Sequence, residues 1–201
     1  MRVVSRTAWF LGGIFVSTLT YGLTLKANLG LGPLFVIQDG LHQRLGITIG
    51  TAVIWTGVGF VLLACAFRSW PGPGTIIGPF IGGPLLDWML PHLPDLHGFW
   101  LRLVVCTAAV WVMALGGAMG IKARMGIAGL DATMMGIHRV THVAVSRVRI
   151  GLEASMLVVG WILGGSVGIG TVICGALIGH GIQFWLRLLG ERPLDHVPEV
   201  V

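Results

Sequence analysis

The sequence predicts an all-α integral membrane protein with six transmembrane helices in two inverted three-helix repeats, each repeat carrying a short re-entrant helix. The prediction rests on composition, on long charge-free runs and on an internal repeat. Of the 201 residues, 55% are hydrophobic and 10% are charged, and the mean hydropathy is +0.88. Because roughly a quarter of the residues of a soluble domain are charged, most of this chain cannot face water.

The charged residues do not indicate a nucleic-acid partner. There are 13 Lys and Arg against 8 Asp and Glu, a formal net charge of +5, but the basic residues lie at the ends of apolar runs, as membrane topology requires. Cys65, Cys106 and Cys174 lie inside apolar stretches. We interpret them as small buried residues and expect neither disulfides nor a metal cluster.

Apolar runs give the candidate crossings, because a helix needs about 20 residues to cross the bilayer. Four such runs are residues 8–25, 50–67, 74–90 and 103–121, of which the third carries Asp87 near its end. Residues 154–186 carry no charge, and the Gly-rich segment 164–170 divides them into two helices, the first beginning near Ile150. No A-x-A cleavage site follows the first run, so we expect a retained helix rather than a signal peptide.

The chain repeats itself at an offset of 96 residues. Residues 26–31 align with 122–127, and in the same register residues 72–75 align with 168–171. The sequence therefore divides into repeat one at 1–98, repeat two at 99–190 and a cytoplasmic tail at 191–201.

Each repeat also contains a short segment between its first and second crossings. Residues 34–45 and 130–141 follow the Gly-rich turns 29–33 and 125–129. Segments of about 10 to 14 residues are too short to cross a bilayer, so we expect re-entrant helices.

Three crossings in a repeat exchange the sides of the membrane, so the second repeat is expected to be inverted. The Lys and Arg distribution favours this arrangement with a cytoplasmic N-terminus. The ten residues then on the cytoplasmic side are Arg2, Arg6, Arg68, Lys122, Arg124, Arg139, Arg147, Arg149, Arg187 and Arg192. The three on the other side are Lys26, Arg44 and Arg102. Both termini are therefore expected in the cytoplasm.

This architecture favours one class of function. Inverted repeats are typical of secondary transporters, whose solute sites lie near the membrane midplane where broken helices meet. The N-terminus of a short helix carries partial positive charge and unpaired N–H groups, so the two Gly-rich turns would form such a centre. The alternative is that these glycines only let helices pack closely.

Four motifs, at residues 26–33, 126–131, 160–165 and 167–171, resemble those of the YczE/YitT-type bacterial membrane proteins. The resemblance covers about residues 10–186 and implies a multi-pass protein of the bacterial inner membrane with no firmly established activity. Family members tend to have an Asp two residues after the Pro of the first motif. Repeat two has the equivalent Asp131, but repeat one has Phe35. Asp39, one helical turn later, is the candidate to replace it.

Ionisable residues inside membrane helices are costly and are therefore candidates for function. Arg149 and Glu153 lie one turn apart, either as a structural ion pair or with Glu153 as a proton or cation site. Asp131 either contributes to a site or complements a helix dipole. Lys26 and Lys122 either bind solute or extend to the membrane interface. The complete set of candidate solute-binding residues is Asp131, Glu153, Arg149, Asn28, Gly30, Gly32, Gly126, Gly129, Asp39, Lys26 and Lys122.

No pattern indicates an enzyme, a cofactor or a metal site. G-x-S-x-G, H-E-x-x-H and P-loop motifs are missing. His138 and His142 have a spacing that could bind a metal from one helix face, but no adjacent Glu or Cys completes a site.

Two functions remain. One is a permease for a small polar or ionic solute, embedded in the lipid bilayer, for which a homodimer is plausible. The other is a non-transporting accessory protein that binds a partner complex. A permease should gather Asp131, Glu153 and the Gly-rich turns around one cavity, whereas an accessory protein should leave them scattered.

Overall fold

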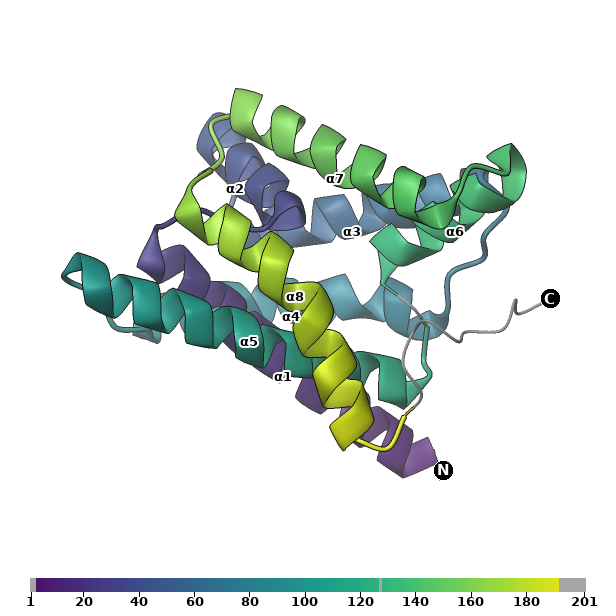
Figure 1. Cartoon of the computed structure of the whole chain (residues 1–201), viewed down its shortest axis with the longest axis horizontal. Helices are drawn as coiled ribbons and strands as arrows, with labels where there is room; N and C mark the ends of the chain where they lie inside the picture. Colours follow the sequence, from purple (N-terminus) through teal and green to yellow (C-terminus); the bar gives the residue numbers. More distant parts are fainter. Residues whose placement is uncertain (1–2, 127, 192–201) are drawn as a thin grey trace.

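The computed structural model describes residues 3–126 and 128–191, which form helices and no strand. Figure 1 shows these helices, which in chain order are α1 Val3–Ala27, α2 Pro33–Leu45, α3 Ile49–Ala66, α4 Pro73–Met89, η1 Leu90–His92 (a 3₁₀ turn), α5 Phe99–Ala123, α6 Gly129–Thr141, α7 Val145–Ile162 and α8 Ile169–Leu188. Arg2, Arg192 and the predicted tail beyond Glu191 lie outside the described residues.

Four of these helices, α1, α3, α5 and α8, are long and apolar enough to cross a membrane. Two further expected crossings do not meet this standard, because α4 has only 17 residues and α7 contains Arg147, Arg149 and Glu153. α7 also begins at Val145, earlier than the expected Ile150. Counting charge-free residues missed its first turn, although arginine is a good helix former.

The short helices α2 and α6 have sharp ends. α2 begins at Pro33, whose fixed φ suits the first turn of a helix. It ends at Gly46, which has a left-handed φ of 67° and donates its N–H to the His42 carbonyl at 2.9 Å. α6 ends in the same way at His142, with φ of 55° and a 2.8 Å bond to the His138 carbonyl. Both helices have 13 residues, a length of about 20 Å.

The offset found in the sequence recurs in the structure. The bounds of α1, α2 and α3 coincide, shifted by 96, with those of α5, α6 and α7. Hydrogen bonds between the repeats recur as well: the Gly74 N–H donates to the Met125 carbonyl at 2.7 Å, and the Gly170 N–H to the Leu29 carbonyl at 2.7 Å. The two bonds are equivalent, because Gly74 corresponds to Gly170 and Leu29 to Met125 at the 96-residue offset.

Two arginines join the ends of α1 and α5. The Arg102 Nε donates to the Ala27 carbonyl at 2.5 Å and its Nη2 to the Asn28 carbonyl at 3.0 Å. Arg6 makes the equivalent bonds at the end of α5: its Nε donates to the Ala123 carbonyl at 3.0 Å, and its Nη2 donates to the Arg124 carbonyl. Because the start of each helix meets the end of the other, α1 and α5 run antiparallel, as Figure 1 shows.

The helices form two groups that exchange elements between the repeats. α4 packs on α1 and α8 packs on α5, in the lower part of Figure 1. In the upper part, α2 lies mainly against α7 and α6 mainly against α3. Each short helix therefore packs chiefly on a long helix of the other repeat. The packing of α3 along α4 connects the two groups.

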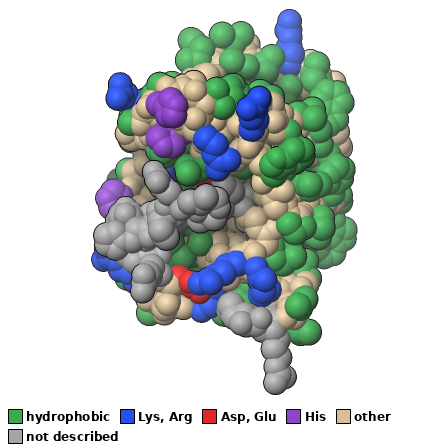
Figure 2. Space-filling view, turned by 90° about the vertical axis from the view of Figure 1, so that its right-hand side faces the viewer, with side chains coloured by type: hydrophobic (Ala, Val, Ile, Leu, Met, Phe, Trp, Pro, Cys, Tyr) green, Lys and Arg blue, Asp and Glu red, His purple; other side chains and the backbone are tan. Residues whose placement is uncertain are grey.

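Basic side chains gather at the end of the molecule where α5 and α8 finish and α7 begins, which Figure 2 views directly. Hydrophobic side chains cover the neighbouring flank in that view. At this end Lys122 Nζ donates to the Leu189 carbonyl at 2.6 Å, and Arg124 pairs with Glu191 at 3.1 Å. An apolar flank beside a charged end is the surface expected of a protein that lies in a bilayer.

Candidate functional site

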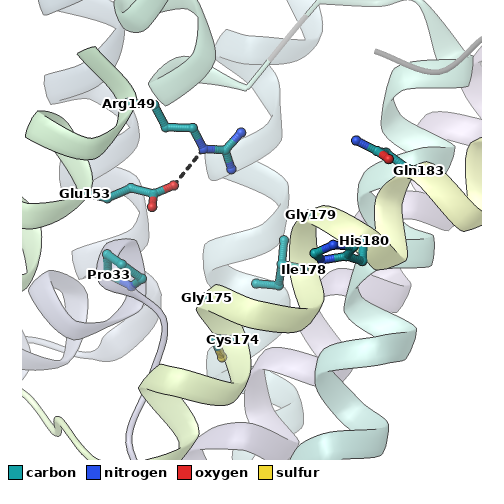
Figure 3. A pocket seen from close by; sticks show the side chains of 9 residues that line it. All are labelled: Pro33, Arg149, Glu153, Cys174, Gly175, Ile178, Gly179, His180 and Gln183. Atoms are coloured by element: carbon teal, nitrogen blue, oxygen red, sulfur yellow. Dashed lines mark hydrogen bonds and ion pairs between the residues drawn. The ribbon is translucent and has the colours of Figure 1, made fainter. Parts of the chain in front are cut away.

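An ion pair on α7 faces α8 across a cavity (Figure 3). The Arg149 Nε donates to the Glu153 Oε1 at 2.9 Å, and the two residues lie one helical turn apart. The cavity has a volume of about 320 Å³. Its other lining residues are Pro33 of α2 and Cys174, Gly175, Ile178, Gly179, His180 and Gln183 of α8. We call it the α7–α8 cavity.

Polar side chains of α8 contribute to the same cavity. The His180 Nδ1 lies 2.9 Å from the Ala176 carbonyl oxygen, which leaves the other ring nitrogen available. The Gln183 amide has no hydrogen-bond partner among the residues that the structure describes. With the ion pair, the cavity presents a guanidinium, a carboxylate, an imidazole and an amide, all of which can bind a small polar or charged solute.

Asp131 lies close to this ion pair. It is in the first turn of α6, which also packs against α7. Burial disfavours a charge on the Asp131 carboxyl, the Arg149 guanidinium favours it, and Glu153 opposes it. The Arg149 guanidinium therefore lies within electrostatic reach of two carboxyl groups and makes its ion pair with Glu153. We call Asp131, Arg149 and Glu153 the charged cluster. The sequence predicted the Arg149–Glu153 pair, and the packing of α6 on α7 adds Asp131 to it.

Lys26, Asn28 and Asp39 lie around a second cavity, of about 410 Å³. Asp39 is 4% exposed, and its Oδ2 accepts a hydrogen bond from the Ser166 N–H at 2.8 Å. Asp39 thus holds the segment between α7 and α8. The remaining lining residues are Leu25, Leu31, His42, Gln43, Ile49, Leu90 and Ser166.

The position equivalent to Asp131 has a different role in the first repeat. Phe35 occupies it and stacks on Tyr21, with ring centroids 4.1 Å apart. Asp39, the candidate replacement, faces the second cavity and not the charged cluster. The two repeats therefore share a backbone pattern but differ in the chemistry of their short helices.

Lys26 at the rim of the second cavity pairs with Asp95, in the loop before α5, at 2.6 Å. The hydrogen bond and the positive charge of Lys26 lower the pKa of the Asp95 carboxyl from its ordinary value of 3.8. A carboxyl whose pKa is lower in the folded state contributes stability above its unfolded pKa and loses it as the pH falls through the folded pKa.

We therefore expect Asp95→Asn to melt below the wild-type protein at neutral pH, and the two melting temperatures to converge in acid, below pH 3.8. Thermal unfolding in detergent over a pH series measures the difference. A difference that stays constant into acid would show that the charge of Asp95 is not its cause.

The Gly-rich turns pack against the other repeat. Gly30, with φ of 103°, lies against Gly168, and Gly126, with φ of 132°, lies against Gly72. A Cβ at Gly30 would lie 2.8 Å from the Gly168 Cα, and one at Gly126 would lie 3.0 Å from the Gly72 Cα. Both the left-handed backbone and the close approach require glycine. The observed contacts of these two residues are those of helix packing.

The other candidates are dispersed. Gly32 lies against Cys174 beside the α7–α8 cavity, and Gly129 packs on α3. Lys122 lies at the far end of α5, where its ammonium is bonded to a carbonyl and stands 4.8 Å from the centre of the Trp9 ring. Lys122 therefore lines neither cavity.

Sequence reasoning missed the α8 residues of the cavity. Gln183, Gly175 and Gly179 carry no charge and match no motif. The internal repeat held a signal, because Gln183 is the equivalent of Asp87, a carboxylate near the end of an apolar helix. A polar residue at the same position of both repeats would have been reason to examine this face.

The fold and the apolar helices define an all-helical membrane protein. The chain belongs to the family of unknown function DUF6198, which matches residues 4–187. The resemblance to YczE-type membrane proteins is thus confirmed.

Three relatives are similar over nearly their whole lengths. The "Uncharacterized membrane protein YczE" of Bacillus subtilis is 29% identical, covering 92% of this chain and 87% of its own. An "Uncharacterized protein" of Haemophilus influenzae is 25% identical, covering 98% and 97%. The "Uncharacterized protein YyaS" of Bacillus subtilis is also 25% identical, covering 91% and 93%. No solved structure matches the chain.

Proposed function

We propose that this protein is a permease for a small polar or ionic solute, that the solute passes through the α7–α8 cavity, and that it catalyses no reaction. The observation that carries the proposal is the charged cluster beside that cavity. Charged side chains within a membrane helix bundle are costly and occur where they face a pathway or one another. Arg149, Glu153 and Asp131 would bind the solute, with His180 and Gln183 opposite.

Six crossings in two inverted repeats suit this function. α4 and α7 do not meet the length and composition expected of a membrane-spanning helix. Their equivalents at the 96-residue offset, α8 and α3, do meet it. α1 and α5 are equivalent yet antiparallel, so a two-fold axis relating them is perpendicular to both helices. If both cross the bilayer, that axis lies in the membrane plane, as in inverted-repeat transporters. α2 and α6, about 20 Å long, would be the re-entrant helices.

The charges support an orientation in the bacterial inner membrane. Arg6, Lys122 and Arg124 lie together at the end viewed in Figure 2, and Lys26 and Arg102 lie at the other. By the positive-inside rule the first end would be cytoplasmic, together with the start of α1 and the end of α8. The α7–α8 cavity extends along α8 from Cys174 to Gln183, and its Gln183 end lies toward the proposed cytoplasmic end.

Thermal stabilisation in detergent tests the proposal. The panel is sodium chloride, sodium acetate, sodium phosphate, guanidinium chloride and the neutral, acidic and basic amino acids. A ligand at a hundred times its Kd stabilises the folded state by about 2.7 kcal/mol. We expect at least one compound to raise the melting temperature of the wild type but not of Asp131→Asn or Glu153→Gln. Arg147→Gln, on the same helix but outside the cavity, is the matched control and should keep the response.

Two results would contradict the proposal. A response lost in Asp39→Asn but kept in Asp131→Asn would move the site to the second cavity. No response to any compound, with both variants as stable as the wild type, would favour the accessory role, and co-purification of a partner complex would then be the next experiment.

A further inference from the structure

Two equivalent pairs of helices differ in this structure. In the first repeat α3 packs along α4, whereas in the second α7 makes hardly any contact with α8. The α3–α4 contact is tight: a Cβ at Gly50 would overlap the Gly83 carbonyl, and a Cβ at Gly57 would overlap the Pro79 ring. The same positions of the second repeat are Ser146 with Gly179 and Glu153 with Gly175. Glu153, Gly175 and Gly179 line the α7–α8 cavity (Figure 3).

The residues of α7 and α8 nevertheless suit a closed contact. In the first repeat the small Gly57 of α3 meets the larger Pro79 of α4. At the equivalent positions of the second repeat the sizes are exchanged: α7 has the large Glu153 and α8 has the small Gly175. Gly175 and Gly179 have open space where a Cβ would stand. Glycine in a helix interior costs about 1 kcal/mol relative to alanine, and no contact with the part of the chain that the structure describes requires glycine at these two positions.

A hydrogen-bonded contact holds the α3–α4 pair closed. Asp87 Oδ2 accepts from the Thr48 Oγ1 at 2.6 Å, and Oδ1 accepts from the Gly50 N–H at 2.8 Å. We call this the Asp87 latch. It joins the end of α4 to the start of α3. The equivalent positions are Gln183 and Ala144, so α7 and α8 lack the carboxylate and the hydroxyl that make the latch.

We propose that the α3–α4 and α7–α8 contacts open alternately, so that the protein is a carrier and not a channel. This inference rests on the proposed function and deepens it. In the structure α7 and α8 stand apart across the cavity, and the α3–α4 side is latched. In the opposite state α7 closes on α8, with Glu153 against Gly175, and α3 separates from α4. Closure takes the charged cluster out of water, which is costly unless charges are compensated, so a solute that balances the cluster favours the exchange.

Cysteine accessibility tests the alternation without a known solute. In proteoliposomes, with Cys65, Cys106 and Cys174 replaced by Ala, Gly175→Cys and Pro79→Cys mark equivalent positions on the two sides. A membrane-impermeant maleimide should label Gly175→Cys and leave Pro79→Cys nearly unlabelled. Asp87→Gln, which copies the second repeat, should raise Pro79→Cys labelling about tenfold, equivalent to the loss of about 1.4 kcal/mol, and lower Gly175→Cys labelling.

The reverse exchange is the matched variant. Gln183→Asp with Ala144→Thr places the latch residues on the α7–α8 side and should lower Gly175→Cys labelling. Thr48→Ala removes one latch bond and keeps Asp87, so it tests the latch if Asp87→Gln fails to fold. Melting temperature in detergent reports folding for every variant.

The outcomes separate this inference from the proposed function. Labelling of Pro79→Cys that rises while that of Gly175→Cys stays constant would overturn alternation, because the two sides would then open independently. Equal labelling of both cysteines in the latched protein would overturn it as well. Reciprocal labelling without any stabilising compound in the panel would support the conformational exchange and contradict the proposed solute site.

Discussion

Adding one methyl group at Gly170 is expected to lower the free energy of unfolding by about 3 kcal/mol, because backbone atoms occupy the space it needs. Gly170 lies at the start of α8, and its N–H donates to the Leu29 carbonyl at 2.7 Å. A Cβ there would overlap the Gly30 carbonyl oxygen. No side chain can move aside to relieve this overlap. Unfolding of Gly170→Ala by heat or by SDS in mixed micelles measures the loss.

Gly175→Ala is the matched control for that substitution. It lies on the same helix, but no atom of residues 3–126 and 128–191, apart from its own helix backbone and chain neighbours, stands within 4 Å of where its Cβ would be. Because alanine favours a helix over glycine by about 1 kcal/mol, we expect its stability to equal or slightly exceed that of the wild type. Equal losses in the two variants would mean that the close approach of α8 to residues 29–30 does not limit stability.

Arg149→Met is expected to lower the free energy of unfolding by about 2 kcal/mol. The substitution leaves Glu153 and Asp131 near each other with no cation between them. Loss of one partner of a fully buried ion pair costs about 3 to 5 kcal/mol. The Arg149 and Glu153 side chains are 48% and 34% exposed, so solvent screens part of the repulsion and the expected loss is smaller.

A second substitution tests whether the three charges act together. Asp131→Asn in the Arg149→Met background removes one of the two carboxyl groups that lack a cation. It should raise the free energy of unfolding of that variant by about 1 kcal/mol, which is the size of coupling found between neighbouring residues. Arg147→Met is the control, since Arg147 is exposed and has no side-chain partner among the described residues. Its change should stay within about 0.5 kcal/mol. Equal losses for Arg147→Met and Arg149→Met would argue against the charged cluster.

Much of the helical pattern follows from local rules in the sequence. The Gly-rich segment 164–170 was predicted to divide two helices; α7 ends at Ile162 before it, and α8 begins at Ile169 inside it. The short segments after the Gly-rich turns are α2 and α6. Helix punctuation depends on residues near in sequence, so it can be read from the chain. α7 began before its expected start because charge-free length is a measure of apolarity and not of helix propensity.

The candidate site was predictable only in part. The Arg149–Glu153 pair follows from i, i+4 spacing on one helix. The approach of Asp131 depends on how α6 packs beside α7, and spacing along the chain carries no information on it. The separation of α7 from α8 could not be predicted from the sequence either. The internal repeat predicts the same contact for α3 with α4 and for α7 with α8, and both pairs contain small residues. For Gly30 and Gly126 the sequence allowed a binding role or a packing role, and the backbone contacts support packing.

The exchange of short helices between repeats has a consequence for synthesis. When the ribosome has made α2, the helix against which it mainly packs, α7, does not yet exist. Asp39 is likewise translated more than a hundred residues before Ser166, from whose N–H it accepts a hydrogen bond. Until the second half is made, Asp39 lacks the Ser166 N–H and α2 lacks the surface of α7, and α3 is the helix of the first half that packs against α2. A product of translation that stops after α4 would lack the surface that covers α2, so the two repeats mature as one unit.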